Sequence, residues 1–355
     1  MAPVVALEQM RNSVLGLATA VILLAVFLLF QRCVAAIAAA RRNRREPGLS
    51  RLIYCAVQSS SADANDLREL GRFDRGLVRS MLLDLALDLK GDTSDAIARL
   101  YGELGFIRSD LKRLRSWRAT TRAHAAADLG LIHSPESMPA LADALNDSDT
   151  RVRQAAVWAI GQVGTAAALA ELVPLLGDSS LPVAQRAQEV LASRGHEVAE
   201  AILSCAASTP CRAARLAAIE LIGWLRITDG ADLMSVCMRD LDPEVRIKSV
   251  KAAAAIGDPR FLEPFHALLD DQRWEVRCQA AKGLSLFGSP SSVPRLRAAL
   301  QDRHWWVRFY AATAPAEVGP AGEEALAHAL RDPDPAVHEM ARYLLERGTA
   351  VPALP

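Results

Sequence analysis

The segment DQRWEVRCQAA, residues 271–281, shares a pattern with DSDTRVRQAA, residues 147–156. Both read Asp-x-x-x-x-Val-Arg-x-x-Ala, and related segments recur at a spacing of 31 residues over more than 200 residues. A fixed period of this length is typical of proteins built from stacked helical repeats. The period therefore predicts a solenoid rather than a globular core.

Four columns of residues keep this register. An apolar anchor recurs at Thr121, Val152, Val183, Ala214, Val245, Val276, Val307 and Val337. Five places before the anchors stand Asp147, Asp178, Asp240, Asp271, Asp302 and Asp332. One place after them stand Arg122, Arg153, Arg215, Arg246, Arg277 and Arg308. Four places after them every residue is small: Ala125, Ala156, Ala187, Ala218, Ser249, Ala280, Ala311 and Ala341.

The sequence predicts an all-α, right-handed solenoid of helix pairs, about seven and a half repeats over residues 117–347. Helical stripes off this phase predict an N-terminal cap over 75–116, and residues 348–355 are expected to fray. Glycines near the expected helix ends predict left-handed terminating residues. These glycines are Gly130, Gly161 and Gly223 at one phase, and Gly164, Gly195, Gly257, Gly288 and Gly319 at another.

The repeated motif resembles HEAT repeats of the short bacterial type that are related to bilin-lyase repeats. That resemblance implies the fold, whereas the proteins that share it include scaffolds, adaptors and a few enzymes. The whole chain also resembles a class of membrane-anchored bacterial HEAT-repeat proteins associated with envelope and polysaccharide-synthesis systems. That class implies a protein partner at the membrane.

The amino-terminal region contains an uncharged run of 18 residues, Ser13 to Phe30. This is about the minimum for crossing a hydrocarbon core of roughly 30 Å. We expect a short tail over 1–12, a single transmembrane helix over 13–40, and a basic juxtamembrane segment and linker over 41–74. A cleaved signal peptide ending near Ala40 is the rival interpretation, although its apolar region would be too long.

Charge is divided unevenly along the chain. Lysines plus arginines equal aspartates plus glutamates, 41 against 41, but residues 1–60 carry seven arginines and two glutamates, a net charge of +5. The cluster Arg41–Arg45 predicts that the solenoid stays in the cytoplasm and the N-terminus lies outside the inner membrane. The remaining net charge of −5 argues against a nucleic-acid groove.

The Asp and Arg columns predict a structural ladder. An Asp before a helix accepts free backbone N–H groups, and an Arg in the first turn lies beside the Asp of a neighbouring repeat. Each exposed rung is expected to contribute under about 1 kcal/mol. The third repeat carries Ala184 in place of the Arg, and Thr209 follows in place of the next Asp. These two changes predict a bend or a looser joint.

The sequence offers no pattern for a cofactor or a metal. Deoxyhypusine hydroxylases, which share this repeat, hold iron with four His-Glu pairs, but only His196-Glu197 and His338-Glu339 occur here, at different phases. The six cysteines form no Cys-x-x-Cys pair, and no phosphate loop or nucleophile elbow is present. We expect no catalytic residues and no cofactor.

Two aromatic residues in the seventh repeat depart from the register. Trp306 and Tyr310 stand where other repeats carry charged or polar residues, and they are four residues apart on one helix face. With Arg303, Arg295 and Arg297 they form a candidate partner-binding patch, since aromatics and arginine are enriched at interface hot spots. Alternatively, the final repeats fold back and cover it. Trp274 and Trp305 share another phase and are expected to pack on the ridge between repeats.

The sequence therefore predicts a membrane-anchored scaffold or adaptor that is not an enzyme. It would position a membrane-associated partner protein at the cytoplasmic face, one example being an enzyme of envelope polysaccharide synthesis. The alternatives are a lyase-like or metal-hydroxylase-like enzyme, which bound metal or chromophore would favour, and a self-assembling array, which would form concentration-dependent oligomers.

Overall fold

The computed structural model describes residues 2–58, 64–89, 91–316, 327, 329–331 and 335–347. These residues form helices and no strands. The chain divides into two compact units, residues 1–112 and 113–355. The expected tail 348–355, the ladder residue Asp332 and most of the expected helix 322–331 lie outside the described residues.

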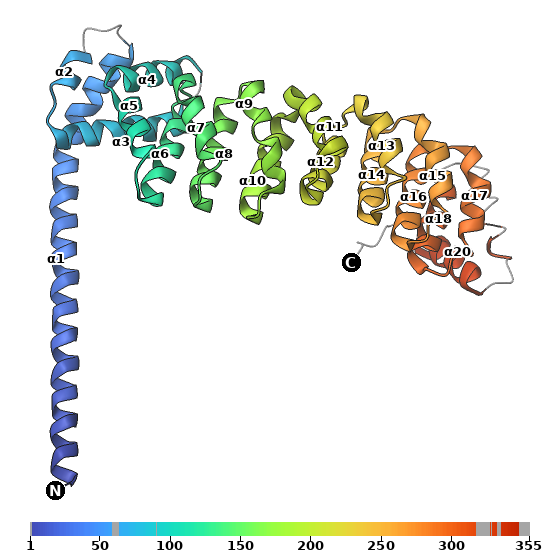
Figure 1. Ribbon diagram of the computed structural model, residues 1–355, viewed down its shortest axis with the longest axis horizontal. Helices are drawn as coiled ribbons and strands as arrows, with labels where there is room; N and C mark the ends of the chain where they lie inside the picture. The colour runs from blue at the N-terminus through green and yellow to red at the C-terminus, as the bar shows by residue number, and fades with distance from the viewer. Residues whose placement is uncertain are drawn as a thin grey trace. The chain divides into compact units, whose positions relative to one another are not determined.

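The first unit is built from five helices among its described residues (Figure 1). They are α1 Ala2–Gln58, α2 Ala64–Arg68, α3 Arg72–Asp88, α4 Asp92–Glu103 and α5 Phe106–Leu114. The last three form the cap expected over 75–116, although α3 begins earlier, at Arg72. The linker expected over 41–74 is different, because α1 continues through Pro47 to Gln58. Leu49 and Ile53 explain this: both are buried, in the part of α1 that contacts α3 and α4.

A buried carboxylate holds the core of this first unit together. Asp110 is fully buried and accepts hydrogen bonds from Arg79, at 2.7 Å, and from the Tyr101 hydroxyl. A buried carboxylate that lost both donors would be strongly destabilising. This cluster therefore has a structural role.

The membrane span expected over 13–40 falls largely on residues whose side chains lie outside the described part of the chain. Within that part, the structure contains no helix that is both long enough and apolar enough to cross a bilayer. The described apolar side chains of α1 between Leu23 and Phe30 are exposed.

The second unit consists of helix pairs stacked side by side (Figure 1). The first helices are α6 Ala119–Leu131, α8 Thr150–Val163, α10 Leu181–Arg194, α12 Arg212–Trp224, α14 Pro243–Ile256, α16 Trp274–Phe287, α18 Trp305–Ala316 and α20 Pro335–Arg347. The second helices are α7 Met138–Ala144, α9 Ala166–Ala170, α11 Ala199–Ser208, α13 Ala231–Cys237, α15 Leu262–Leu268 and α17 Val293–Ala299.

The anchor and small-residue columns form the core of the stack. Every anchor from Val152 to Val337 is buried, and so is every member of the small column. Ser249 fits among the alanines because its hydroxyl donates to the Val245 carbonyl at 2.7 Å. The sequence prediction of the repeated core is confirmed.

The expectation of left-handed terminating glycines was wrong for the first phase and for Gly195 of the second phase, whose φ is −65°. Gly164, Gly257 and Gly288 have left-handed φ angles of 63°, 76° and 56° and end their helices as expected. Gly130 and Gly223 instead lie inside α6 and α12. A Cβ atom at Gly130 would stand 2.6 Å from the Cα atom of Ala159, and one at Gly223 would stand 2.7 Å from that of Ala252. These two glycines lie inside helices and allow the adjacent helix to approach closely. They do not terminate a helix.

Candidate protein-binding surfaces

The Asp and Arg columns form a ladder between successive repeats. Each Arg pairs with the Asp 25 residues later, as in Arg122–Asp147, where two hydrogen bonds measure 2.7 Å. The other rungs are Arg153–Asp178, Arg215–Asp240, Arg246–Asp271 and Arg277–Asp302. The hydrogen bond from Arg122 lowers the pKa of Asp147 below its ordinary value. The predicted ladder is confirmed where both partners are described.

The rungs of Arg122, Arg153, Arg246 and Arg277 also fix the turn before a first helix. Arg277 donates to the Asp271 carbonyl at 2.8 Å, while Asp302 accepts from the His304 backbone N–H at 2.8 Å. The ladder Asp thus lies in the turn, two residues before the helix N-cap. The rungs are mostly buried, with 9% and 11% of the Arg277 and Asp302 side chains exposed. In the other rungs between 9% and 25% of each side chain is exposed, so these rungs are partly exposed as expected.

The missing rung at the third repeat is filled by close packing. The end of the second-helix segment at Val173–Gly177 contacts α12 directly, and the Cys211 thiol approaches the Gly177 carbonyl at 3.9 Å. A Cβ atom at Gly177 would stand 2.5 Å from Cys211 Sγ and 3.1 Å from the Ala214 Cβ atom. Repeats two and four therefore touch here, and the bend or looser joint that the sequence predicted stays a prediction.

Tyr310 is not exposed, so that expectation was wrong. Only 3% of Tyr310 is accessible to solvent. The centroid of its ring lies 6.5 Å from that of Trp306, and Lys282 Nζ of α16 lies 5.5 Å from the Tyr310 ring centroid. Lys248 and Glu220, 2.6 Å apart, occupy the same two register positions in α14 and α12. The position three places after the anchor thus contacts the preceding repeat, which explains why a polar residue there did not indicate exposure.

The other members of the predicted patch are spread over α17, α18 and the turn between them. Trp306 is half-buried, whereas Arg295, Arg297 and Arg303 are exposed. The Arg295 guanidinium lies 3.5 Å from the carboxylate of Asp270, in the turn that follows α15. Their role in partner binding stays a prediction.

The remaining tryptophans of this region pack as ridge residues. Trp274 stacks on His304 of the next repeat at 5.0 Å. Trp305 stacks on Phe309 at 5.2 Å and meets Tyr343 of α20 edge-on, yet 40% of it remains exposed. Among the described residues, Lys282 of α16 covers one side of Tyr310.

An apolar row that the sequence reasoning missed runs along the C-terminal ends of α12, α14 and α16. Trp224 and Leu286 are 60% and 64% exposed and stand ten places after their anchors. Ala255 holds the same position between them, while Gln162 and Ser193 hold it in earlier repeats. The register comparison used for Trp306 would have found this row. We call Trp224, Ala255 and Leu286 the exposed row.

A shallow groove adjoins the exposed row. It has a volume of about 320 Å³ and lies between α12 and α14. Trp224 and Ala255 line it, together with Lys251 and the ion-paired Lys248 and Glu220. Exposed aromatic and aliphatic groups beside charged ones are typical of a protein-binding surface.

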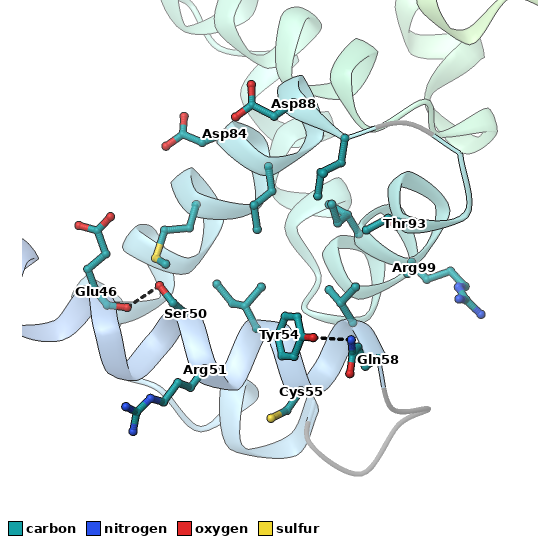
Figure 2. Close-up of a pocket in the computed structure, with 17 residues that line it drawn as sticks. Glu46, Ser50, Arg51, Tyr54, Cys55, Gln58, Asp84, Asp88, Thr93 and Arg99 are labelled. Atoms are coloured by element: carbon teal, nitrogen blue, oxygen red, sulfur yellow. Dashed lines mark hydrogen bonds between the residues drawn. The ribbon is translucent and has the colours of Figure 1, made fainter.

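The first unit contains a larger groove of about 1060 Å³ (Figure 2). Its walls are the end of α1 from Glu46 to Gln58, the end of α3, and the start of α4. The Tyr54 hydroxyl accepts a hydrogen bond from Gln58 at 2.7 Å, and its ring points into the groove. We call this the cap groove.

Little in the described residues indicates catalytic chemistry. They include no group of three or more His, Cys, Asp or Glu side chains placed to hold a metal ion. Burial raises the pKa of the Cys278 thiol to about 11, and it also raises those of Cys205 and Cys237. Thiols of raised pKa are poor nucleophiles near neutral pH.

Comparison with known proteins identifies the repeats. A family model described as HEAT repeats matches residues 110–192, 199–271 and 262–346. The chain belongs to the HEAT-repeat family. No curated protein sequence matches it.

Several solved structures match this chain at low identity. Importin beta is 15% identical with a TM-score of 0.50, over 88% of this chain and 47% of that one. Human deoxyhypusine hydroxylase is 19% identical with a TM-score of 0.30, over 68% of this chain and 95% of that one. The CpcE–CpcF complex of phycocyanin lyase from a Nostoc species is 18% identical with a TM-score of 0.30, over 67% of this chain and 94% of that one. The match to importin beta, at 15% identity, shows a shared fold alone, and a fold does not imply a function.

Proposed function

We propose that this HEAT-repeat protein is a membrane-anchored adaptor that binds a partner protein and holds it at the cytoplasmic face of the inner membrane. The observation that carries the proposal is the exposed row. Two large apolar side chains, Trp224 and Leu286, face solvent at one register position on a rigid stack of helices. Exposed apolar groups aligned on a rigid scaffold favour binding another protein.

The anchor part of the proposal rests on α1. Its sequence contains the uncharged run from Ser13 to Phe30, followed by the basic cluster Arg41–Arg45. Its described side chains from Leu23 to Phe30 are exposed rather than packed on the first unit. A helix that is apolar all round needs an apolar environment, and the basic cluster favours a cytoplasmic solenoid.

The adaptor would act by positioning. An anchor confines the solenoid to the bilayer surface, which raises its effective concentration toward a partner held at the same surface. The partner is then expected to be membrane-associated. The resemblance to membrane-anchored bacterial HEAT-repeat proteins extends this proposal to an enzyme of envelope polysaccharide synthesis.

Co-purification from native membranes in mild detergent tests the proposal. The full-length protein is compared with a Trp224→Ala/Leu286→Ala variant, and partners are identified by mass spectrometry. Leu181→Ala is the matched control, because Leu181 is 67% exposed but lies outside the exposed row. We expect one protein to be lost from the double variant and kept by the control. The same partner in all three samples would refute the exposed row as its binding site, and no partner in any sample would refute the adaptor.

A further inference from the structure

The cap groove has an apolar floor between three helices. Ile53 and Val57 of α1, Met81 and Leu85 of α3, and Ile97 of α4 line it. Ile53 and Ile97 are buried, whereas Tyr54 is 63% exposed although its ring points inward (Figure 2). The base of the groove is therefore packed, whereas the ring of Tyr54 leaves apolar surface open above it.

The charges around this floor are mainly acidic. Glu46, Asp84 and Asp88 line the groove from the side of α1 and α3. Figure 2 shows the two arginines of the lining, Arg51 and Arg99, directed away from it. Three carboxylates against two arginines give the lining a net charge of −1.

Arg42 already pairs with two carboxylates of this acidic rim. Arg42 lies 3.7 Å from Asp84 and 3.6 Å from Glu46, and all three side chains are more than 40% exposed. Exposed pairs of this length are weak. A cation from a partner can therefore replace Arg42 at little cost.

We infer that the cap groove binds an amphipathic helix of a partner protein, with its apolar face on the groove floor and a row of Lys or Arg against Glu46, Asp84 and Asp88. This inference rests on the proposed adaptor function and names a chemical class of partner segment. Helices bind in apolar grooves through side chains at i, i+3, i+4 and i+7. The acidic rim selects a basic flank and disfavours an acidic one.

The length of the groove fits such a helix. The wall from Glu46 to Gln58 spans 13 residues of α1, which at 1.5 Å per residue is about 20 Å. About three to four turns of a partner helix would cover it. The same charges disfavour an anionic phospholipid, because its phosphate would meet the three carboxylates.

Site-specific photocross-linking in cells that make the full-length protein tests the inference. A photoreactive phenylalanine analogue replaces Tyr54 in one sample and Leu87 in the other. Leu87 is the matched control, since it is 60% exposed on α3 but does not line the groove. We expect cross-links from position 54 to a protein segment with helical apolar spacing and a Lys- or Arg-rich flank. Cross-links to lipid, to a second copy or to an acidic segment, or none specific to position 54, would overturn the inference.

Charge reversal provides the second arm. Asp84→Lys/Asp88→Lys should lower the cross-link yield from position 54 at least about tenfold. Arg51→Glu/Arg99→Glu changes as many charges on side chains directed away from the groove and should leave the yield within about twofold. Both aspartates are exposed, so the fold should survive. Equal losses in the two variants would overturn the inference.

The co-purification experiment separates failure of the inference from failure of the adaptor. If a partner co-purifies equally with Asp84→Lys/Asp88→Lys and does not cross-link to position 54, the cap groove is not its site although the adaptor function stands. If no partner co-purifies with the wild-type protein, the adaptor function itself is refuted.

Discussion

At the scale of single residues, each ladder arginine joins three parts of the stack. Arg277 pairs with Asp302 of the next repeat at 2.6 and 2.9 Å, and it also donates to the carbonyl of Asp271 in its own turn. Asp302 in turn accepts from the backbone of His304. A rung therefore fixes two turns and one interface, and its side chains are too buried for water to replace the lost bonds.

Replacing Arg277 with alanine should weaken the stack. The change leaves the carboxylate of Asp302, whose side chain is only 11% exposed, without its guanidinium. We expect the free energy of unfolding to fall by about 2–3 kcal/mol. Urea unfolding followed by circular dichroism measures this. Arg212→Ala is the control, because Arg212 pairs with Asp242 while 62% of its side chain is exposed, and it should cost under about 1 kcal/mol. Equal losses would contradict the structural role of burial.

Acid should destabilise the protein in a defined pH range. The hydrogen bond from Arg151 lowers the pKa of Asp149 from 3.8 to about 2, and the pKa of Asp147 is also lowered, first by the bond from Arg122. A carboxylate with a lowered pKa contributes stability that is complete above its unfolded pKa and is lost as pH falls through its folded pKa.

Stability should therefore stay level from about pH 7 to 5 and fall between about pH 4 and 2. Thermal unfolding followed by circular dichroism across this range provides the measurement. Asp149→Asn should show a smaller loss, because one of the titrating groups is gone. A wild-type protein whose stability rises on acidification would contradict this account.

At the scale of elements, the sequence determined the helix pairs more completely than their contacts. The 31-residue columns predicted the first helices, the buried anchors and the ladder partners, because each column has one repeated physical role. The exposure of Tyr310 was mispredicted because its register position contacts the preceding repeat, where a lysine or an aromatic ring packs equally well. The phase of Gly130 and Gly223 was misassigned because close helix packing and helix termination both favour glycine.

Gly223→Ala tests the packing role of glycine. A Cβ atom would clash with the backbone of Ala252, which cannot move like a flexible side chain, so we expect a loss of about 1–3 kcal/mol. Gly76→Ala in α3 is the control, because a Cβ atom there has no neighbour within 4 Å and alanine favours a helix by roughly 1 kcal/mol. Urea unfolding of each variant would show destabilisation for Gly223→Ala alone. Unchanged or increased stability of Gly223→Ala, which helix propensity alone would give, would contradict the packing role of this glycine.

At the scale of the whole molecule, the proposal combines an anchor, a cap and a repeat stack. The repeats and their family follow from the sequence because periodicity records them directly. The exposed row and the cap groove do not follow so directly, since each depends on which side chains the folded helices leave uncovered. The cap groove in particular joins residues from 46 to 99, in a region that has no period to reveal it.

Membrane association should depend on the amino-terminal helix. After carbonate extraction, the full-length protein is expected to stay in the membrane pellet, whereas a variant lacking residues 1–40 should be released into the supernatant. In spheroplasts, the solenoid should resist added protease because it lies inside. Full release of the intact protein by carbonate would contradict the anchor, and cleavage of the solenoid from outside would contradict the orientation.

The most direct test of the adaptor is the dissociation constant of the purified full-length protein for its co-purified partner, measured by titration calorimetry in the same detergent. We expect Trp224→Ala/Leu286→Ala to weaken binding at least about tenfold, as loss of hot-spot side chains does, and Leu181→Ala to leave it unchanged. An unchanged dissociation constant for the double variant would contradict the claim that the exposed row binds the partner.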